Sequence, residues 1–563
     1  MSKTFSFALI VFCLAVSVWY SPVLFKGYSP DVLSSPILLA RNLSQTGVYS
    51  IDNELNVVLS SNLIKEKGQP SIASGKLVAV IYAKFFNLTG AFARENLILI
   101  SISIYALALV VLALVVLYLF NLKVASVFSL IYIFLPFFWK LPYHLGIYDF
   151  CLLFFALFFL LFFYGLKQKR EYLYLIPAGI FLALASMSKE VIFLFVPFLF
   201  VFLWLNKQKK HLVYIFIPLV IVLSIYWLPD MLQGRNAYLS SMPGQTSEKV
   251  AAADLNYYGE FFPDPYTYHF NKEAYLKKYR KELNNKEIDF FYRARLAKSS
   301  SNTGAEGIGL VDRVRIIISL VPRHLSKFSA IEYTGGPLML LLIILGAVYL
   351  KQKDKYLYRF VLSWIASVIF LLSFVFLMGR SHLVDFGWAI ALLASLGLLF
   401  LIEILKKHFS LKGKMSVFLS LGLMLLVLYN LILAGHVAWG KVFDRERDYL
   451  LLRAYEQKIK GADIADSDVV AVPLGISEIY HLNYSTDKSM VLFQPETIEF
   501  LLAKNDLRAA FEKFGVKYVL GYSDDLTGKI LKQTPAKNIA ANTIEVKQPE
   551  VSQTKIWFLN LIK

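Results

Sequence analysis

A few ionisable side chains stand at the ends of long apolar runs, where they could act on a substrate held at a membrane surface. Asp31 follows the first apolar run by six residues, and Asp149 begins a later run. A partly desolvated carboxylate at such a place can serve as a base for a hydroxyl group. Lys189 and Glu190 interrupt the almost continuous apolar sequence 175–205. Because charges at membrane depth are costly, this pair is a candidate for function.

Further polar side chains lie at neighbouring junctions between apolar runs. His144 and Asp149 flank one short connection, and Arg380 and His382 punctuate a later one. A guanidinium donates two parallel charge-assisted hydrogen bonds, so Arg380 suits a phosphate group. If these groups face one compartment, they could line a single cavity in which cations hold a lipid-linked phosphate and a carboxylate activates a nucleophile.

Each of these residues also has a purely structural interpretation. Asp31 follows a proline and suits a turn, and Asp149 could be an acid placed favourably at a helix N-terminus. Lys189 and Glu190 could pair with each other in a tight turn. Arg380 could be an interfacial anchor whose charged head reaches water. The sequence leaves both interpretations open at every position.

The elements that must position these residues are membrane-spanning helices. Of the 563 residues, 57% are apolar, with 46 Phe and 33 Tyr, whereas soluble domains contain about 45–50%. Runs of roughly 20 apolar residues are long enough to cross a bilayer, and helices satisfy their own backbone groups there. The runs predict eleven spans, at about 5–25, 96–120, 124–142, 148–166, 172–188, 190–206, 211–229, 336–350, 356–378, 384–405 and 415–436.

The distribution of positive charge orients these spans. The net charge is +18, and the Lys-rich short loops all fall on one side when the N-terminus is placed inside. No basic stripe interleaved with aromatic residues appears outside the spans, so nucleic acid is not an expected partner. The segments 26–95 and 230–335 and the tail from about 444 then lie outside. We expect a helix from Ser35-Pro36 to Gly47, because Ser caps and Pro suits a first turn.

The tail has the pattern of a small α/β domain. Short β-branched and aromatic runs predict four strands, and one long amphipathic run predicts a helix that ends at a glycine. The strands are expected at 468–473, 489–494, 516–522 and 555–561, and the helix at 496–514. The fold class is therefore a polytopic α-helical membrane protein with about eleven spans, residues 1–443, followed by a small C-terminal α/β domain, residues 444–563.

Common soluble-enzyme motifs are absent from the sequence. There is no phosphate-binding loop, dinucleotide fingerprint, zinc-type histidine pair or nucleophile elbow in a credible context. Cys13 and Cys151 both fall inside apolar runs, so no disulfide framework is expected. No soluble cofactor is therefore expected.

Several of these segments form a pattern seen in one superfamily. They are the acidic residue early in the first outer loop, the following segment 40–43, Tyr148-Asp149 at the start of the fourth span, and the small-residue stretch 178–189 that ends in Ser-Lys. The membrane region thus resembles the GT-C glycosyltransferases, which include the protein O-mannosyltransferases and the bacterial aminoarabinose lipid A transferases. The tail segment 514–519 is also similar to bacterial members.

The sequence departs from the family pattern at two places. Pro30-Asp31 stands where the family has an Asp-Glu pair, and Arg380-Ser381-His382 lacks the family's proline. Matched position by position, the resemblance implies that Asp31 is the catalytic base and Asp149 supports it. The residues assigned to substrate binding are Lys189, Arg380, His144, Glu190, Arg41 and His382, of which Lys189 and Arg380 would contact phosphate.

The resemblance implies a glycosyltransferase that moves a sugar, with inversion, from a polyprenyl-phosphate donor to a hydroxyl group. The acceptor would be a glycan, lipid or protein on the outer face of the cytoplasmic membrane. A divalent metal stays open, because some branches of the superfamily use one with paired acids. The alternative is a secondary transporter or flippase, or a polysaccharide-assembly component, for a lipid-linked substrate. Transporters often show inverted repeats and broken helices at mid-membrane, whereas here the ionisable residues gather at outer span ends.

Overall fold

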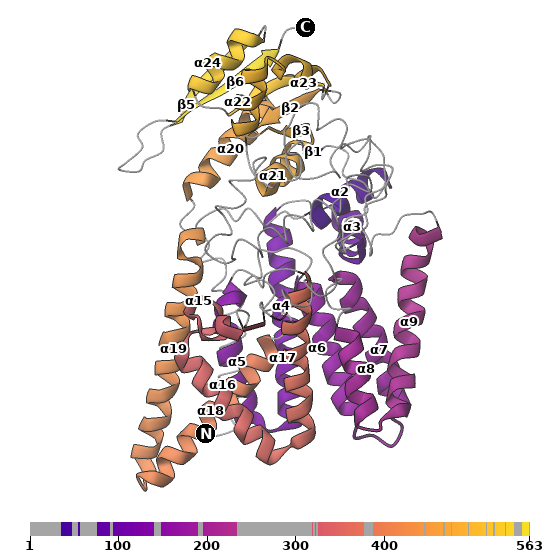
Figure 1. Ribbon diagram of the computed structural model, residues 1–563, viewed down its shortest axis with the longest axis vertical. Coiled ribbons are helices and arrows are strands. Elements are labelled where there is room, and N and C mark those ends of the chain that lie inside the picture. The colour runs from indigo at the N-terminus through magenta and orange to yellow at the C-terminus, as the bar shows by residue number, and fades with distance from the viewer. Residues whose placement is uncertain are drawn as a thin grey trace.

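The computed structural model describes residues 35–47, 54–56, 76–90, 94–139, 148–189, 195–232, 318–375 with short gaps, 387–443, and 446–561 with short gaps. Among these residues, long helices form a bundle in the lower part of the molecule, and a β-sheet with its own helices lies above it (Figure 1). Helices α2 (Ser35–Thr46) and α3 (Lys76–Thr89) lie between the two parts.

The bundle consists of apolar helices from three parts of the chain. By length and composition, five described helices can cross a membrane, namely α4, α6, α9, α18 and α19, while α5, α7 and α8 are shorter apolar helices. The chain is therefore a multi-pass membrane protein. The bounds are α4 (Arg94–Leu119), α5 (Leu122–Phe134), α6 (Tyr148–Gly165), α7 (Tyr172–Ser188), α8 (Phe195–Leu205), α9 (Lys209–Leu232), η5 (Lys327–Ser329), α15 (Ile331–Thr334), α16 (Pro337–Lys353), α17 (Lys355–Val375), α18 (Gly387–His408) and α19 (Gly413–Phe443).

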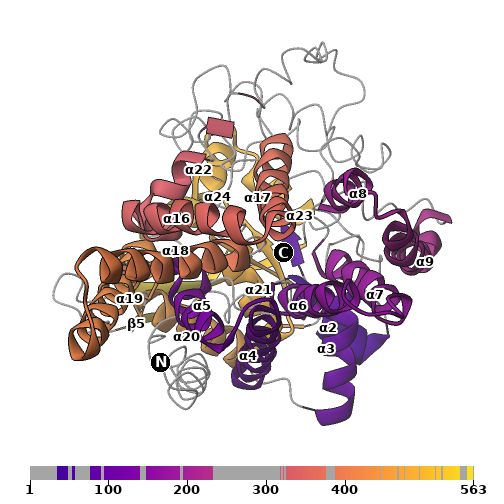
Figure 2. The same ribbon diagram turned by 90° about the horizontal axis from the view of Figure 1, so that it is seen from below.

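Helices differ in how far they are enclosed by the bundle. Every residue of α5 from Val124 to Phe134 is buried, as are the first thirteen residues of α18, from Gly387 to Leu399. By contrast α9 and α19 lie at opposite edges of the bundle (Figure 2) and expose apolar rows, among them Val213, Ile217, Val220, Val417, Phe418 and Leu421. Such rows suit contact with lipid chains.

Two glycines allow α16 and α18 to cross closely, and these helices lie side by side in Figure 2. A Cβ atom built on Gly346 would lie 1.8 Å from the Leu393 carbonyl oxygen, and one built on Gly397 would lie 1.9 Å from that of Leu342. Small residues at such a crossing let two backbones touch, which drives helix association in membranes. No larger residue fits here without separating the helices.

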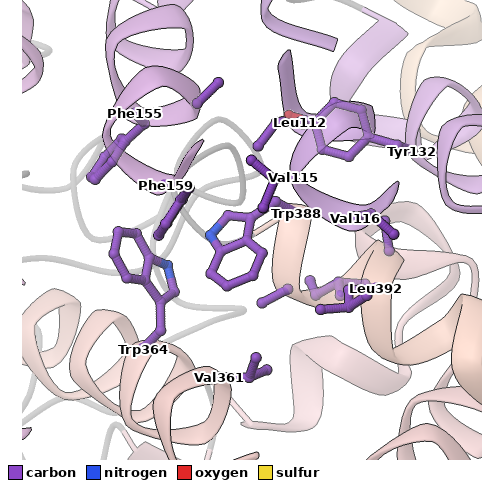
Figure 3. Close-up of a cluster of buried hydrophobic side chains, with 14 of the residues drawn as sticks. Leu112, Val115, Val116, Tyr132, Phe155, Phe159, Val361, Trp364, Trp388 and Leu392 are labelled. Carbon is purple, nitrogen blue, oxygen red and sulfur yellow. The ribbon is translucent and has the colours of Figure 1, made fainter. Parts of the chain in front are cut away.

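An aromatic cluster joins three helices that are distant in sequence (Figure 3). The Phe159 ring of α6 lies 4.4 Å from Trp388 of α18 and 4.9 Å from Trp364 of α17, measured between ring centroids. Phe155 lies one helical turn away and contacts Trp364 at 5.0 Å. Tilted and edge-on aromatic pairs of this kind add to the stability that burial alone supplies. The cluster therefore holds α6, whose first turn carries Asp149, on a rigid support.

Each predicted span from 96–120 onward overlaps a described helix, while the predicted span 5–25 lies outside the described residues. The total of eleven spans therefore stays a prediction. The predicted span 124–142 was too long, because α5 ends at Phe134 and a short 3-10 helix, η2 (Pro136–Trp139), follows. Leu135 is extended, with φ −60° and ψ 133°. A residue before proline is driven out of the helical region by the proline ring, so Pro136 sets this boundary.

The helix that the sequence predicts from Ser35-Pro36 to Gly47 is confirmed. Helix α2 begins at Ser35 with Pro36 in its first turn, and Gly47 follows its end with a φ of 73°. The Gly47 N–H donates to the Leu43 carbonyl oxygen at 3.0 Å, which is a common helix ending at glycine. One face of α2 is buried against α3, where Tyr82 and Phe86 lie in the same apolar cluster.

The upper part of the described chain contains a six-stranded sheet with the order β1-β3-β2-β4-β6-β5. Strands β1, β3, β2 and β4 are parallel, and β6 runs antiparallel to both β4 and β5. The bounds are β1 (Glu54–Asn56), α20 (Glu446–Gly461), β2 (Val469–Val472), α21 (Ile476–Thr486), β3 (Ser489–Leu492), α22 (Pro495–Lys504), α23 (Leu507–Lys513), β4 (Val516–Leu520), α24 (Asp524–Gln533), β5 (Ala536–Ile544) and β6 (Thr554–Leu561).

Four strands lie where the sequence predicted them, within two residues at each end. The features that were not predicted are strands β1 and β5, helices α20, α21 and α24, and a break in the expected helix. Strand β1 comes from the segment 26–95, far from the other strands in the sequence, and pairs with β3, with Glu54 opposite Met490. The expected single helix 496–514 is divided into α22 and α23, because Asn505 has a φ of 60° and the Asp506 N–H donates to the Leu501 carbonyl oxygen. Asparagine tolerates this left-handed conformation and thereby ends a helix.

Candidate functional site

Asp149 lies in the first turn of α6 and is almost fully buried, with 3% of its surface exposed. Its Oδ1 accepts a hydrogen bond from the Phe150 N–H at 2.8 Å. The first N–H groups of a helix have no partner inside the helix, and the helix dipole favours an anion there. Asp149 therefore does stabilise the start of α6, as the structural interpretation predicts. That role can be filled by an acid at the surface, so it does not explain why Asp149 is buried.

The second oxygen of Asp149 contacts a tyrosine of α3, which precedes the bundle helices in the sequence. The Tyr82 hydroxyl of α3 donates to Asp149 Oδ2 at 3.4 Å, and the Tyr82 ring packs edge-on against Phe150 at 5.8 Å. Tyr82 is buried, so the bond forms away from bulk water, where hydrogen bonds to a charge are strongest. A group on α3 thus orients the carboxylate of α6.

Lys189 comes to the same place from the end of α7. The helix stops at Ser188, and Lys189 is extended, with φ −147° and ψ 105°, while its N–H still donates to Ala185. This turn carries the side chain over the Tyr148 ring, whose centroid lies 4.4 Å from Nζ. Lys189 is 6% exposed. A cation over an aromatic face is attracted by the ring, with about 2 kcal/mol or more when water is excluded.

Tyr148 directly precedes Asp149, so the carboxylate and the ammonium flank one short segment at the start of α6. The two groups come from adjacent, packed helices, α6 and α7. A buried anion and a buried cation held by separate elements can act on different atoms of one substrate: the ammonium on a phosphate oxygen, and the carboxylate on a proton or a positive centre.

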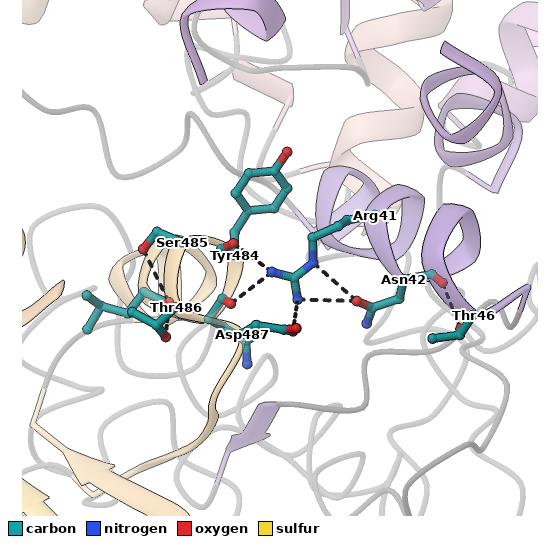
Figure 4. Close-up of polar contacts among 9 residues, drawn as sticks. Arg41, Asn42, Thr46, Tyr484, Ser485, Thr486 and Asp487 are labelled. Carbon is teal, nitrogen blue, oxygen red and sulfur yellow. Dashed lines mark hydrogen bonds and ion pairs between the residues drawn. The ribbon is translucent and has the colours of Figure 1, made fainter. Parts of the chain in front are cut away.

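Arg41 lies on α2, in contact with the helix α21 of the sheet region (Figure 4). Its Nη1 donates to the carbonyl oxygens of Asn483 at 3.0 Å and Tyr484 at 2.6 Å, and its Nη2 pairs with Asp487 at 3.1 Å. Both Nε and Nη2 also reach Asn42 Oδ1, at 3.4 and 3.3 Å. Burial lowers the pKa of Arg41, and the Asp487 carboxylate acts in the opposite direction.

Of the predicted site residues, the structure describes Asp149, Lys189 and Arg41. Lys189 lies over the ring of Tyr148, the residue before Asp149, while Arg41 contacts α21. The predicted residues Asp31, His144, Glu190, Arg380 and His382 lie outside the described residues. Within the described ranges, no group of three or more His, Cys, Asp or Glu side chains is arranged to hold a metal ion.

Sequence reasoning missed Tyr82 and Tyr148 as members of the site. Tyr148 was noted only as part of a family pattern, and Tyr82 was one of many tyrosines in an apolar segment. A tyrosine carries a polar tip on an apolar ring and usually finds a partner when buried. Tyr82 lies on the apolar face of α3 that packs against the protein. A tyrosine hydroxyl on such a face needs a buried partner, and this is the sequence signal from which its role could have been predicted.

The sequence matches no protein-family model and no curated protein sequence. Solved structures are similar over nearly the whole chain. The oligosaccharyltransferase AglB from Archaeoglobus fulgidus, in complex with an inhibitory peptide and a dolichol-phosphate, has a TM-score of 0.51 at 13% identity, covering 92% of this chain and 69% of its own. The same enzyme tethered to an acceptor peptide has a TM-score of 0.55 over 92% and 69%.

ArnT from Cupriavidus metallidurans, bound to undecaprenyl phosphate, is similar over both full lengths. Its TM-score is 0.53 at 10% identity, and the match covers 99% of this chain and 98% of that one. At such low identity these likenesses show the fold. The chain has the fold of the GT-C membrane glycosyltransferases.

Proposed function

We propose that this protein is a glycosyltransferase that takes its sugar from a polyprenyl-phosphate donor. The observation that carries the proposal is the placement of buried Lys189 over the ring of Tyr148, the residue directly before buried Asp149, in a fold similar to that of two enzymes solved with dolichol-phosphate or undecaprenyl phosphate. A buried ammonium beside lipid-facing helices suits the single phosphate of such a donor.

In the proposed reaction the acceptor hydroxyl attacks the anomeric carbon of the sugar from the face opposite the phosphate. The new C–O bond forms as the bond between that carbon and the phosphate oxygen breaks, so the configuration inverts. The polyprenyl phosphate leaves with the bonding electron pair, and Lys189 stabilises its growing negative charge. The proton of the acceptor passes to a carboxylate, which the family resemblance assigns to Asp31, with Asp149 in support.

The proposal includes an orientation of the protein in the membrane. The N-terminus is inside, and the C-terminal sheet region, residues 444–563, lies outside the cytoplasmic membrane together with loops 26–95 and 230–335. In a variant without native cysteines, a cysteine at Ser552 should react with an impermeant thiol reagent on intact cells, and one at Lys169 should not. The reverse labelling would overturn this orientation.

The decisive experiment uses purified full-length protein with a polyprenyl-phosphate sugar and an acceptor extract. Release of polyprenyl phosphate together with a glycosylated acceptor supports the transferase. Lys189→Met should raise the KM for the donor by roughly 10- to 100-fold, the cost of about 1.5–3 kcal/mol for one charge-assisted bond. Movement of intact donor across vesicles without sugar transfer would instead establish the transporter.

A further inference from the structure

Arg41 uses every hydrogen-bond donor that its side chain possesses on protein atoms. A guanidinium has five N–H bonds. The Nε hydrogen points to Asn42, the two hydrogens of Nη1 reach two backbone carbonyl oxygens of α21, and those of Nη2 reach Asn42 and Asp487 (Figure 4). No donor is left for a phosphate oxygen. This geometry favours a structural use of Arg41 over the predicted contact with substrate.

Apart from Asn42 of α2, the acceptors belong to one feature, the C-terminal end of α21. The last four carbonyl groups of a helix have no partner inside it, and they attract a positive charge. Arg41 meets two of them, at Asn483 and Tyr484, and its guanidinium carbon lies 5.2 Å from the Tyr484 ring centroid. Asp487 follows the helix with a φ of 56° and pairs with the same guanidinium. Arg41 thus caps a helix that lies 442 residues further along the chain.

The segment that contains α2 and the segment that contains α21 are joined by a second contact, between strands β1 and β3. Strand β1 begins eight residues after α2 ends and pairs in parallel with β3, which begins three residues after α21 ends. Leu55 lies opposite Val491 in this ladder. The first outer loop is therefore attached to the sheet region twice, by side chain at α2 and by backbone at β1.

We propose that Arg41 is a positioning residue through which the C-terminal sheet region sets the place of the first outer loop over the active site. The path runs through packed elements: α21 holds Arg41, α2 packs on α3, and α3 carries Tyr82, which donates to Asp149. The inference rests on the proposed function for its kinetic part only.

The structural part is tested by hydrogen exchange on the full-length protein in lipid nanodiscs. Arg41→Met and Asp487→Asn should both increase exchange in peptides covering 36–46 and 480–492, with the larger increase for Arg41→Met. The peptides of α6 and α18 should be unchanged. Arg508→Met is the matched control, because Arg508 is exposed and pairs with Glu512 of its own helix, α23. Unchanged exchange in both peptides of Arg41→Met would overturn the proposal.

The kinetic part separates positioning from substrate contact. Misplacing a reacting group by about 1 Å can cost roughly 100-fold in rate, so Arg41→Met should lower kcat by about 10- to 100-fold while the donor KM stays within about twofold. Arg41→Lys, which keeps the charge at the helix end, should recover part of the kcat. A raised donor KM with normal kcat and normal exchange would show that Arg41 binds substrate. If neither the parent protein nor any variant transfers sugar, the proposed function fails. The exchange result then still shows whether Arg41 holds α2 to the end of α21.

Discussion

Replacing Asp149 by Asn is the sharpest perturbation of the site. Asn has almost the same shape, and its single oxygen can still accept from the Phe150 N–H, which bonds to Asp149 Oδ1 at 2.8 Å. Its amide group then stands in place of Oδ2, which accepts from the Tyr82 hydroxyl at 3.4 Å, and can donate to that hydroxyl oxygen instead. The substitution therefore removes the negative charge and reverses one hydrogen bond while the side chain keeps its volume. Asp149→Ala removes the acceptors as well and leaves two buried donors without that partner. The two variants therefore separate charge from packing.

The expected losses of stability differ measurably between Asp149→Asn and Asp149→Ala, and the expected loss of kcat for Asp149→Asn is larger still. For Asn, each retained hydrogen bond weakens from the charged to the neutral range, and the favourable helix-dipole term of about 0.3–1 kcal/mol is lost. A buried charge also no longer needs to be desolvated, so we expect a net loss of about 1 kcal/mol in stability. Asp149→Ala leaves each donor unsatisfied at about 1–3 kcal/mol. If the carboxylate acts in the transition state, Asp149→Asn should lower kcat by about 100- to 10,000-fold.

The assay is single-turnover release of polyprenyl phosphate, with thermal unfolding of the same preparations in parallel. Tyr82→Phe serves as an intermediate, because it removes one donor to the carboxylate and keeps the ring packed against Phe150. We expect this variant to lose no more than about tenfold in kcat, the equivalent of one ordinary hydrogen bond. A well-folded Asp149→Asn protein that turns over within about fivefold of the parent would refute the role of Asp149, leaving it as a helix-terminal acid.

Two further predictions concern stability. Gly397→Val should lower the thermal unfolding temperature and the yield, because its Cβ would lie 1.9 Å from a carbonyl oxygen of the facing helix, whereas Gly422→Ala, with open space, should not; equal unfolding temperatures would contradict the close crossing. In the sheet region, His481 at 3.8 Å and a neighbouring lysine lower the pKa of Glu456 to about 2, although burial opposes them. Because the pKa of Glu456 is lower in the folded than in the unfolded protein, its carboxylate adds to the free energy of unfolding above the ordinary pKa of 4.5. This contribution is lost as the pH falls toward 2. The stability difference between parent and Glu456→Gln should therefore shrink over that window, and a constant difference would count against it.

Local patterns of the sequence fixed several elements well. The limits of α2 follow from Ser35-Pro36 and Gly47, whose conformational preferences act within one turn of the chain. The four predicted strands were found because alternating and β-branched runs suit a sheet wherever they occur. By the same local logic Pro136 could have shortened the third predicted span, and Asn505 could have divided the helix 496–514. These two boundaries were not predicted, because each depends on the backbone preference of a single residue inside a longer run that otherwise favours one helix.

The candidate site was only partly contained in the sequence. Asp149 and Lys189 were marked because charges beside apolar runs are rare and expensive, and this cost is visible in one dimension. Tyr82 was not marked, since its partner Asp149 is 67 residues away and nothing local distinguishes it from other tyrosines. Arg41 was marked as a substrate contact, yet its acceptors lie on a helix more than 440 residues further on.

The sequence by itself determined the class of protein and the position of most helices, because the cost of burying polar backbone and charge in lipid acts on each segment separately. Only the tertiary structure decided which segments meet. It places β1 in the sheet of the C-terminal region, and it directs the guanidinium of Arg41 to the carbonyl groups at the end of α21. Contacts of this kind depend on which of many similar surfaces pack together, and that choice is made by the whole fold rather than by any one segment.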